Sequence, residues 1–105
     1  INYPFHSLAD EILYKRARAM ELQGEWQSAL GFYADIVKFY GTDILADNAL
    51  FKSAEILETK LNQAEKALDI YKQLLTQHPG SLYVYETRKR VRRLRGEEIE
   101  KEDEF

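Results

Sequence analysis

The chain has 105 residues, no cysteine and a formal net charge of −3. A chain of this length forms one domain with a modest core, and the absence of cysteine excludes disulfides and thiolate metal sites. No apolar run reaches the ~20 residues that a membrane-spanning helix needs, so we expect no transmembrane segment here.

Apolar residues recur at helical spacing in the first part of the chain. The first helix is expected to begin near Ser7, which can cap it, and to end at Gly24. The second is expected from about Glu25 to Tyr40, followed by Gly41. The apolar faces are Leu8, Ile12, Leu13, Ala17 and Met20 in the first helix, and Trp26, Ala29, Leu30, Tyr33, Ile36, Val37 and Tyr40 in the second.

Two further helices follow the same pattern. The third is expected from about Ile44 to Lys60, with Asp43 as its cap. Asn62, followed three residues later by Glu65, predicts a capping box at the start of the fourth helix. The sequence His78-Pro79-Gly80 is a strong stop signal at its end.

A fifth helix, expected over about 82–95 with Ser81 as its cap, is strongly basic. Its cations could contact nucleic acid, an anionic surface or an acidic partner. Because the whole chain is negative and the following tail, 97–105, is acidic, we favour a solvated capping helix whose cations pair with that tail. We expect the tail to fray and do not expect nucleic acid as a partner. The basic residues are Arg88, Lys89, Arg90, Arg92, Arg93 and Arg95.

Two blocks of the sequence repeat in the same order. Residues 13–21, LYKRARAME, align with residues 50–58, LFKSAEILE, at an offset of 37. Residues 29–37, ALGFYADIV, align with residues 67–75, ALDIYKQLL, at an offset of 38. The one-residue change falls between the paired helices, where a loop absorbs it. One helix pair cannot bury both of its apolar faces alone, so the pairs are expected to stack.

This pattern resembles the tetratricopeptide repeat family. The resemblance implies an all-α fold of antiparallel helix pairs in an α-solenoid, a short right-handed superhelix closed by a capping helix. The domain would cover 1–96, with units at about 8–41 and 44–80, although the family's Trp and Leu are missing and Gly41 stands where Pro is usual. The residues at the repeat's structural positions are Ala17, Ala29 and Tyr33 in the first unit, and Ala54, Ala67, Tyr71 and Pro79 in the second.

A narrower resemblance concerns the last helix and the departures from the family pattern. The segment PGSLYVYETRKRVRRLRGE looks like the end of long repeat proteins from Bacteroidetes, and the divergent units are similar to those of bacterial cell-envelope proteins. This resemblance implies a periplasmic or cell-envelope location. The chain opens with Ile1 and not with Met, so we expect a fragment or a processed form.

Catalytic chemistry has little support in the sequence. The two histidines, His6 and His78, lie far apart, and the chain has no cysteine nucleophile, Gly-rich phosphate loop or nucleophile elbow. We therefore expect no catalytic residue, no metal site and no cofactor.

The family resemblance instead implies a non-catalytic scaffold for protein–protein interaction. In this family the first helix of each pair lines a concave groove that holds a peptide of the partner. Tyr14 and Phe51 share one repeat position outside the main apolar face, so they either anchor a partner or pack against a neighbouring helix. The groove positions are Glu11, Tyr14, Arg18 and Glu21 in the first unit, and Asn48, Phe51, Glu55 and Glu58 in the second. The alternative is self-association through the apolar ends of the repeat stack.

Overall fold

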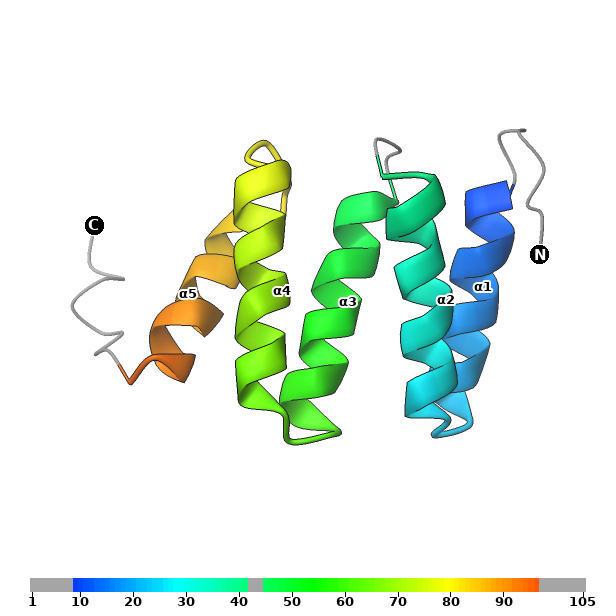
Figure 1. Ribbon diagram of the computed structural model, residues 1–105, viewed down its shortest axis with the longest axis horizontal. Helices are drawn as coiled ribbons and strands as arrows, with labels where there is room; N and C mark the ends of the chain where they lie inside the picture. Colours follow the sequence, from blue (N-terminus) through cyan, green and yellow to red (C-terminus); the bar gives the residue numbers. More distant parts are fainter. Residues whose placement is uncertain (1–8, 42–44, 97–105) are drawn as a thin grey trace.

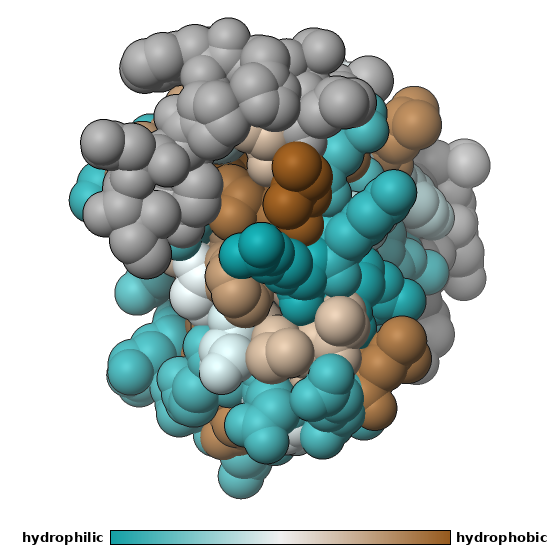
Figure 2. Space-filling model, turned by 90° about the vertical axis from the view of Figure 1, so that its right-hand side faces the viewer, coloured by the Kyte–Doolittle hydropathy of each residue, from teal (hydrophilic) through white to brown (hydrophobic). Residues whose placement is uncertain are grey.

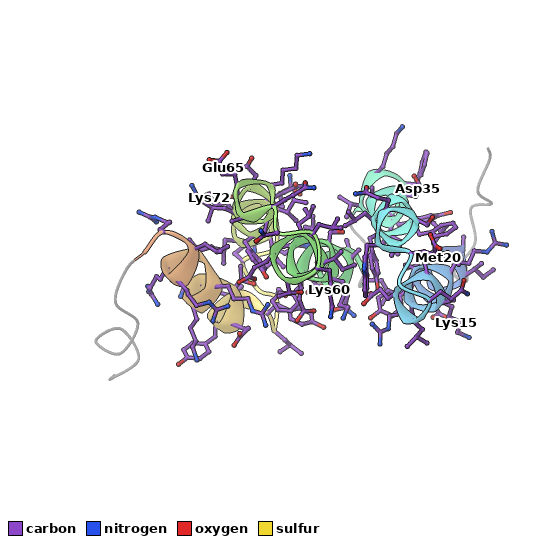
Figure 3. The ribbon with its side chains drawn as sticks, turned by 90° about the horizontal axis from the view of Figure 1, so that it is seen from below. Lys15, Met20, Asp35, Lys60, Glu65 and Lys72 are labelled. Atoms are coloured by element: carbon purple, nitrogen blue, oxygen red, sulfur yellow. The ribbon has the colours of Figure 1, made fainter. Side chains whose placement is uncertain are left out.

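The computed structural model describes residues 9–41 and 45–96, which form five α-helices and no strand (Figure 1). Successive helices are joined at alternating ends and pack mainly against their neighbours in the sequence. Seen along the helices, α1, α3 and α5 lie along one side and α2 and α4 along the other (Figure 3). The predicted all-α fold of helix-pair repeats is confirmed. The helices are α1 (Ala9–Leu22), α2 (Trp26–Phe39), α3 (Ala46–Thr59), α4 (Ala64–Gln77) and α5 (Val84–Leu94).

The helices repeat with a nearly constant spacing. α2 begins at residue 26 and α4 at residue 64, while α3 begins at residue 46 and α5 at residue 84, so both steps are 38 residues. α1 ends at residue 22 and α3 at residue 59, a step of 37. The extra residue therefore lies in the turn 60–63, which is one residue longer than the turn 23–25. α5 takes the place of the first helix of a further unit.

The turns inside the two helix pairs contain residues in the left-handed conformation. Gly24 has φ +75° and Asn62 has φ +55°. The N–H of Gln63 donates to the carbonyl of Leu57 at 2.8 Å and closes the second turn. The predicted capping box of Asn62 with Glu65 is wrong, because Asn62 shapes the turn through its backbone. The N-cap of α4 is Gln63, without a side-chain cap hydrogen bond.

The last helix begins slightly later than expected. Ser81 Oγ accepts a hydrogen bond from the N–H of Tyr83 at 3.0 Å, so Ser81 stabilises the turn that precedes α5. The N-cap itself is Tyr83, and Gly96, with φ +78°, follows the end of the helix. Ser7, Asp43 and the tail 97–105 lie outside the described residues.

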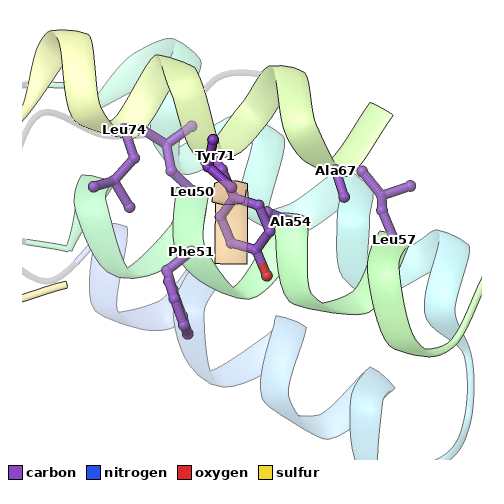
Figure 4. Close-up of a cluster of buried hydrophobic side chains, with 8 residues drawn as sticks. Leu50, Phe51, Ala54, Leu57, Ala67, Tyr71 and Leu74 are labelled. Carbon is purple, nitrogen blue, oxygen red and sulfur yellow. The ribbon is translucent and has the colours of Figure 1, made fainter. Parts of the chain in front are cut away.

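The core consists of two hydrophobic clusters that share α3. One joins α1, α2 and α3, and the other joins α3, α4 and α5 (Figure 4). Small side chains lie where the paired helices come closest, and a tyrosine is the largest fully buried side chain in each cluster. The fully buried alanines at the repeat positions are Ala17 and Ala29 in the first pair and Ala54 and Ala67 in the second, and the tyrosines are Tyr33 and Tyr71.

Candidate functional site

The residues predicted to bind a partner lie on the side formed by α1, α3 and α5, which we call the first-helix face. Figure 3 shows α3 set back between α1 and α5, so this face curves inward. Each helix contributes side chains to it at helical spacing, because residues three or four apart share one side of a helix.

Charged side chains on the first-helix face pair with one another across helices. Glu21, near the end of α1, accepts a hydrogen bond from Arg18 at 3.1 Å and lies 3.6 Å from the ammonium of Lys52 on α3. Lys52 in turn lies 3.3 Å from Glu55. Burial acts to lower the pKa of Arg18, but the charge of Glu21 and the nearby hydroxyl of Tyr33 raise it overall. These charges therefore hold one another in place.

Arg90 on α5 connects three carboxylates. Its guanidinium lies 3.4 Å from Glu55, 3.4 Å from Glu58 and 3.0 Å from Glu86. It also donates to the hydroxyl of Tyr71 at 3.2 Å. Burial acts to lower the pKa of Arg90, but Tyr71 and the carboxylates outweigh burial and raise it. Arg90 therefore belongs to the internal network of the protein and is not a free cation for an external phosphate.

The sequence assigned the cations of the last helix to the acidic tail, but two of them pair with α3. Arg93 lies 3.1 Å from Glu58, beside Arg90. Among the other basic residues, Arg88 is exposed and the ammonium of Lys89 lies 5.5 Å from the ring centroid of Tyr85. Arg92 and Arg95 also make contacts within the protein. Binding of an anionic surface by this helix stays a prediction.

The same three-residue arrangement occurs in both units, and we call it the tyrosine–glutamate–cation triad. A tyrosine of the second helix donates its hydroxyl to a glutamate of the first helix, and a cation from the next first helix approaches that glutamate. In the second unit the Tyr71–Glu58 distance is 2.8 Å. Burial, above all, raises the pKa of both tyrosines, so their hydroxyls stay protonated donors. The members are Tyr33, Glu21 and Lys52, and Tyr71, Glu58 and Arg90.

Phe51 is not an exposed anchor. It is only 7% exposed and stacks on Tyr83, with ring centroids 4.6 Å apart and planes at 18°. The guanidinium of Arg90 lies 5.1 Å from the Phe51 centroid. Of the two alternatives drawn from the sequence, Phe51 packs against a neighbouring segment because Tyr83 covers it. Tyr14 is half-buried and packs edge-on against Tyr33, with centroids 5.8 Å apart.

Sequence reasoning missed Tyr83 as a member of this face. Burial, above all, raises the pKa of Tyr83, and electrostatic interaction with Tyr14, Asp47 and Glu55 raises it further. Tyr83 and Tyr14 are both half-buried, Tyr83 against Phe51 and Tyr14 against Tyr33, and we call these two tyrosines the aromatic surface. The only signal in the sequence was the helical repeat itself, since Tyr83 immediately precedes α5 as Leu45 precedes α3.

An open pocket lies beside this aromatic surface. Its volume is about 660 Å³, and it includes the predicted groove residue Asn48 together with Asp47 and Tyr83. The carboxylate of Asp47 accepts a hydrogen bond from the N–H of Asn48 at 2.8 Å but forms no ion pair with another described residue. The remaining lining comes from the two connections to α3 and α5, at Leu45, Gly80, Ser81 and Leu82.

The outer side of α1 forms one end of the molecule. Figure 2 shows hydrophilic and hydrophobic surface mixed at this end. Ile12, expected on the apolar face, is 47% exposed, and the neighbouring Lys15 and Arg16 are exposed as well. Self-association through this end stays a prediction.

The described residues form neither a metal site nor a membrane-spanning helix. Within 9–41 and 45–96, no three His, Asp or Glu side chains come together as a metal site. No helix in that part of the chain combines the length and apolar character that crossing a membrane requires. The expectation that the protein has no catalytic residue, metal or cofactor stays a prediction.

The comparison with known families bears on the repeat units. A family model described as tetratricopeptide repeat matches at residues 11–42 and again at 48–81, which together make up more than half of the chain. These stretches coincide with the helix pairs α1–α2 and α3–α4. The match gives no support to the narrower resemblance to Bacteroidetes or cell-envelope proteins. Comparison with curated proteins gives no match.

Proposed function

Because the chain belongs to the tetratricopeptide repeat family, we propose that it is a non-catalytic scaffold that binds another protein on its first-helix face. Repeats of this family commonly mediate protein–protein interaction. The observation that carries the proposal is the pair Tyr14 and Tyr83, two half-buried tyrosines of the first-helix face that pack on Tyr33 and on Phe51.

Tyr14 and Tyr83 have the properties of anchor residues. A tyrosine offers a large apolar ring and a polar hydroxyl, and tyrosines are enriched at the centres of protein interfaces. Both rings are already held in the free protein, Tyr14 against Tyr33 and Tyr83 against Phe51. A partner therefore binds rings that lose little conformational freedom on association.

The charges around the tyrosines favour a particular kind of partner. Arg18, Glu21, Lys52 and Glu55 form ion pairs with one another within the protein. They therefore offer a partner hydrogen-bonding groups in fixed positions but little net charge. Asp47, without an ion-pair partner among the described residues, lies in the adjoining pocket. We expect a partner segment with an apolar residue over the tyrosines and a cationic residue near Asp47.

The proposal is tested by affinity capture from a lysate of the source cell, with the chain as bait. The Tyr14→Ala variant removes one anchor, and Tyr85→Ala is the matched control, because Tyr85 is 60% exposed and lies outside the aromatic surface. Circular dichroism checks that each variant is folded. A protein partner that persists at high salt and is lost only with Tyr14→Ala supports the proposal.

Two results of the capture experiment would contradict the proposal. If Tyr14→Ala captures the same proteins as the parent chain, the first-helix face is not the binding surface. If the captured material is nucleic acid and washes off with salt, reversing the charges of Arg88, Arg92 and Arg95 becomes the next step.

A further inference from the structure

A second concave surface lies between α2 and α4, on the side opposite the first-helix face. Figure 3 shows α2 and α4 along that side, with α3 between them and farther back. The cavity there has a volume of about 310 Å³, and we call it the second-helix groove. Most of its lining is apolar: Leu30 and Val37 from α2, Leu50 and Leu57 from α3, and Ile70 from α4.

Two small residues account for the hollow. Ala34 lines the groove from α2, and Ser53 lines it from α3 and is only 6% exposed. With the 38-residue spacing of the helices, the equivalent residues are Lys72 on α4 and Val91 on α5, both of which are larger. The groove therefore depends on Ala34 and Ser53, and the larger Lys72 and Val91 do not leave the same hollow at the equivalent place one repeat later.

The dimensions of the groove suit a helix. From Leu30 to Lys38 the α2 wall rises about 12 Å at 1.5 Å per residue, which is about two helical turns. α2 and α4 run in the same direction along the two sides, so a third helix can lie between them with its apolar face inward. Over two turns, such a helix presents two or three apolar side chains at spacings of three and four residues.

The charge of the groove favours a helix that carries a carboxylate. Among the described residues that line it, Lys38 is charged, Ser53 and Gln73 are polar, and none carries a carboxylate. The ammonium of Lys38 lies 5.2 Å from the ring centroid of Phe39, and the residue is exposed. We propose that the second-helix groove binds an amphipathic helix of a partner protein, which places large apolar side chains against α3 and a carboxylate against Lys38.

The test selects helices from a phage-displayed library of amphipathic peptides of about 15 residues, long enough to form helix on binding. The bait is the full chain, and an unrelated helical protein removes general binders. We expect enriched peptides to carry Leu, Ile, Met or Phe at helical spacing together with Asp or Glu. Enrichment of no peptide over the unrelated protein would overturn the proposal.

The binding face is then established with three single variants at exposed residues, measured by fluorescence anisotropy with a synthesised, labelled copy of the most enriched peptide. Ala34→Gln narrows the groove and should weaken binding about tenfold or more. Lys38→Gln removes the cation and should weaken binding of an acidic peptide about threefold. Lys72→Gln, on α4 outside the groove, is the matched control and should change nothing.

One further variant separates this groove from the proposed function. Tyr14 lies on the first-helix face, on the opposite side of the molecule, so Tyr14→Ala should leave the affinity for the peptide unchanged. A peptide that binds Ala34→Gln as tightly as the parent chain, or that is lost with Tyr14→Ala, would show that the helix does not occupy the second-helix groove.

Discussion

Arg90 lies 3.4 Å from Glu58 and so joins α5 directly to α3 on the first-helix face. The same relation holds one unit earlier, where Lys52 of α3 lies 3.6 Å from Glu21 of α1. The two cations are 38 residues apart, the spacing at which α3 and α5 begin. These pairs therefore link each first helix directly to the preceding one.

Replacing Arg90 with methionine should destabilise the fold. The Arg90 side chain is 17% exposed, and its removal leaves Glu58 and the Tyr71 hydroxyl without their shared partner. We expect the free energy of unfolding to fall by about 1–3 kcal/mol. Arg88→Met is the control, because Arg88 is exposed, and it should change stability by no more than about 0.5 kcal/mol. Urea denaturation measures both; equal stability of the two variants would contradict a stabilising role for the triad.

Enlarging the alanines between paired helices should overpack the core. Ala54 and Ala67 are both 0% exposed and lie in the cluster shared by α3 and α4. Ala54→Leu or Ala67→Leu is expected to cost about 1–3 kcal/mol of stability, whereas Ala19→Leu, at an exposed position of α1, is tolerated. Thermal melting followed by circular dichroism compares them. Unchanged melting of the two core variants would mean that the helices are not closely packed there.

Two glycines should respond to alanine with opposite signs. Gly24 has φ +75°, a conformation that costs an L-residue about 1–2 kcal/mol, so Gly24→Ala should destabilise the protein. Gly31 lies within α2, and a Cβ there meets no atom within 4 Å, so Gly31→Ala should add about 0.5–1 kcal/mol. Chemical denaturation checks both values. A stabilising Gly24→Ala would contradict the left-handed turn.

The buried tyrosines should make stability fall in alkaline solution. Burial, with Glu21 as a further cause for Tyr33, raises the folded-state pKa of Tyr33 and Tyr71 above the ordinary value of about 10. Their contribution is therefore complete below pH ~10 and is lost as the pH rises above it. Phenolate absorbance in the folded chain should lag behind the same titration in concentrated urea. The lag should shrink in the Tyr33→Phe/Tyr71→Phe variant, and a lag of equal size would refute this assignment.

The repeated spacing of small and aromatic residues was enough to predict the fold. Ala17 and Ala54, with Tyr33 and Tyr71, recur in the same order, and burial of such positions depends mainly on helical periodicity. The turn at Asn62 could not be read in the same way. An Asn before a helix caps it through its side chain or shapes the turn in the left-handed conformation, and the sequence does not distinguish the two.

The candidate site was less predictable, because it depends on contacts between distant residues. Tyr14 and Phe51 occupy equivalent positions in their helices, yet Phe51 is buried because Tyr83, from the connection before α5, stacks on it. Likewise, Arg90 belongs to a basic stretch in the sequence but is neutralised by glutamates of α3. Helical periodicity describes one helix at a time and does not say which side chain of the next helix will cover it.

The order in which the helices pack determines how the chain folds. Because the main contacts join consecutive helices, the contact order is low, and rapid folding that starts in either helix pair and spreads to its neighbours is expected. α3 is covered by α2 on one side and by α4 on the other and contributes to both core clusters, while α1 and α5 each pack mainly against one neighbour. Amide protons of α3 should therefore be the last to exchange with solvent, and the outer helices should open first.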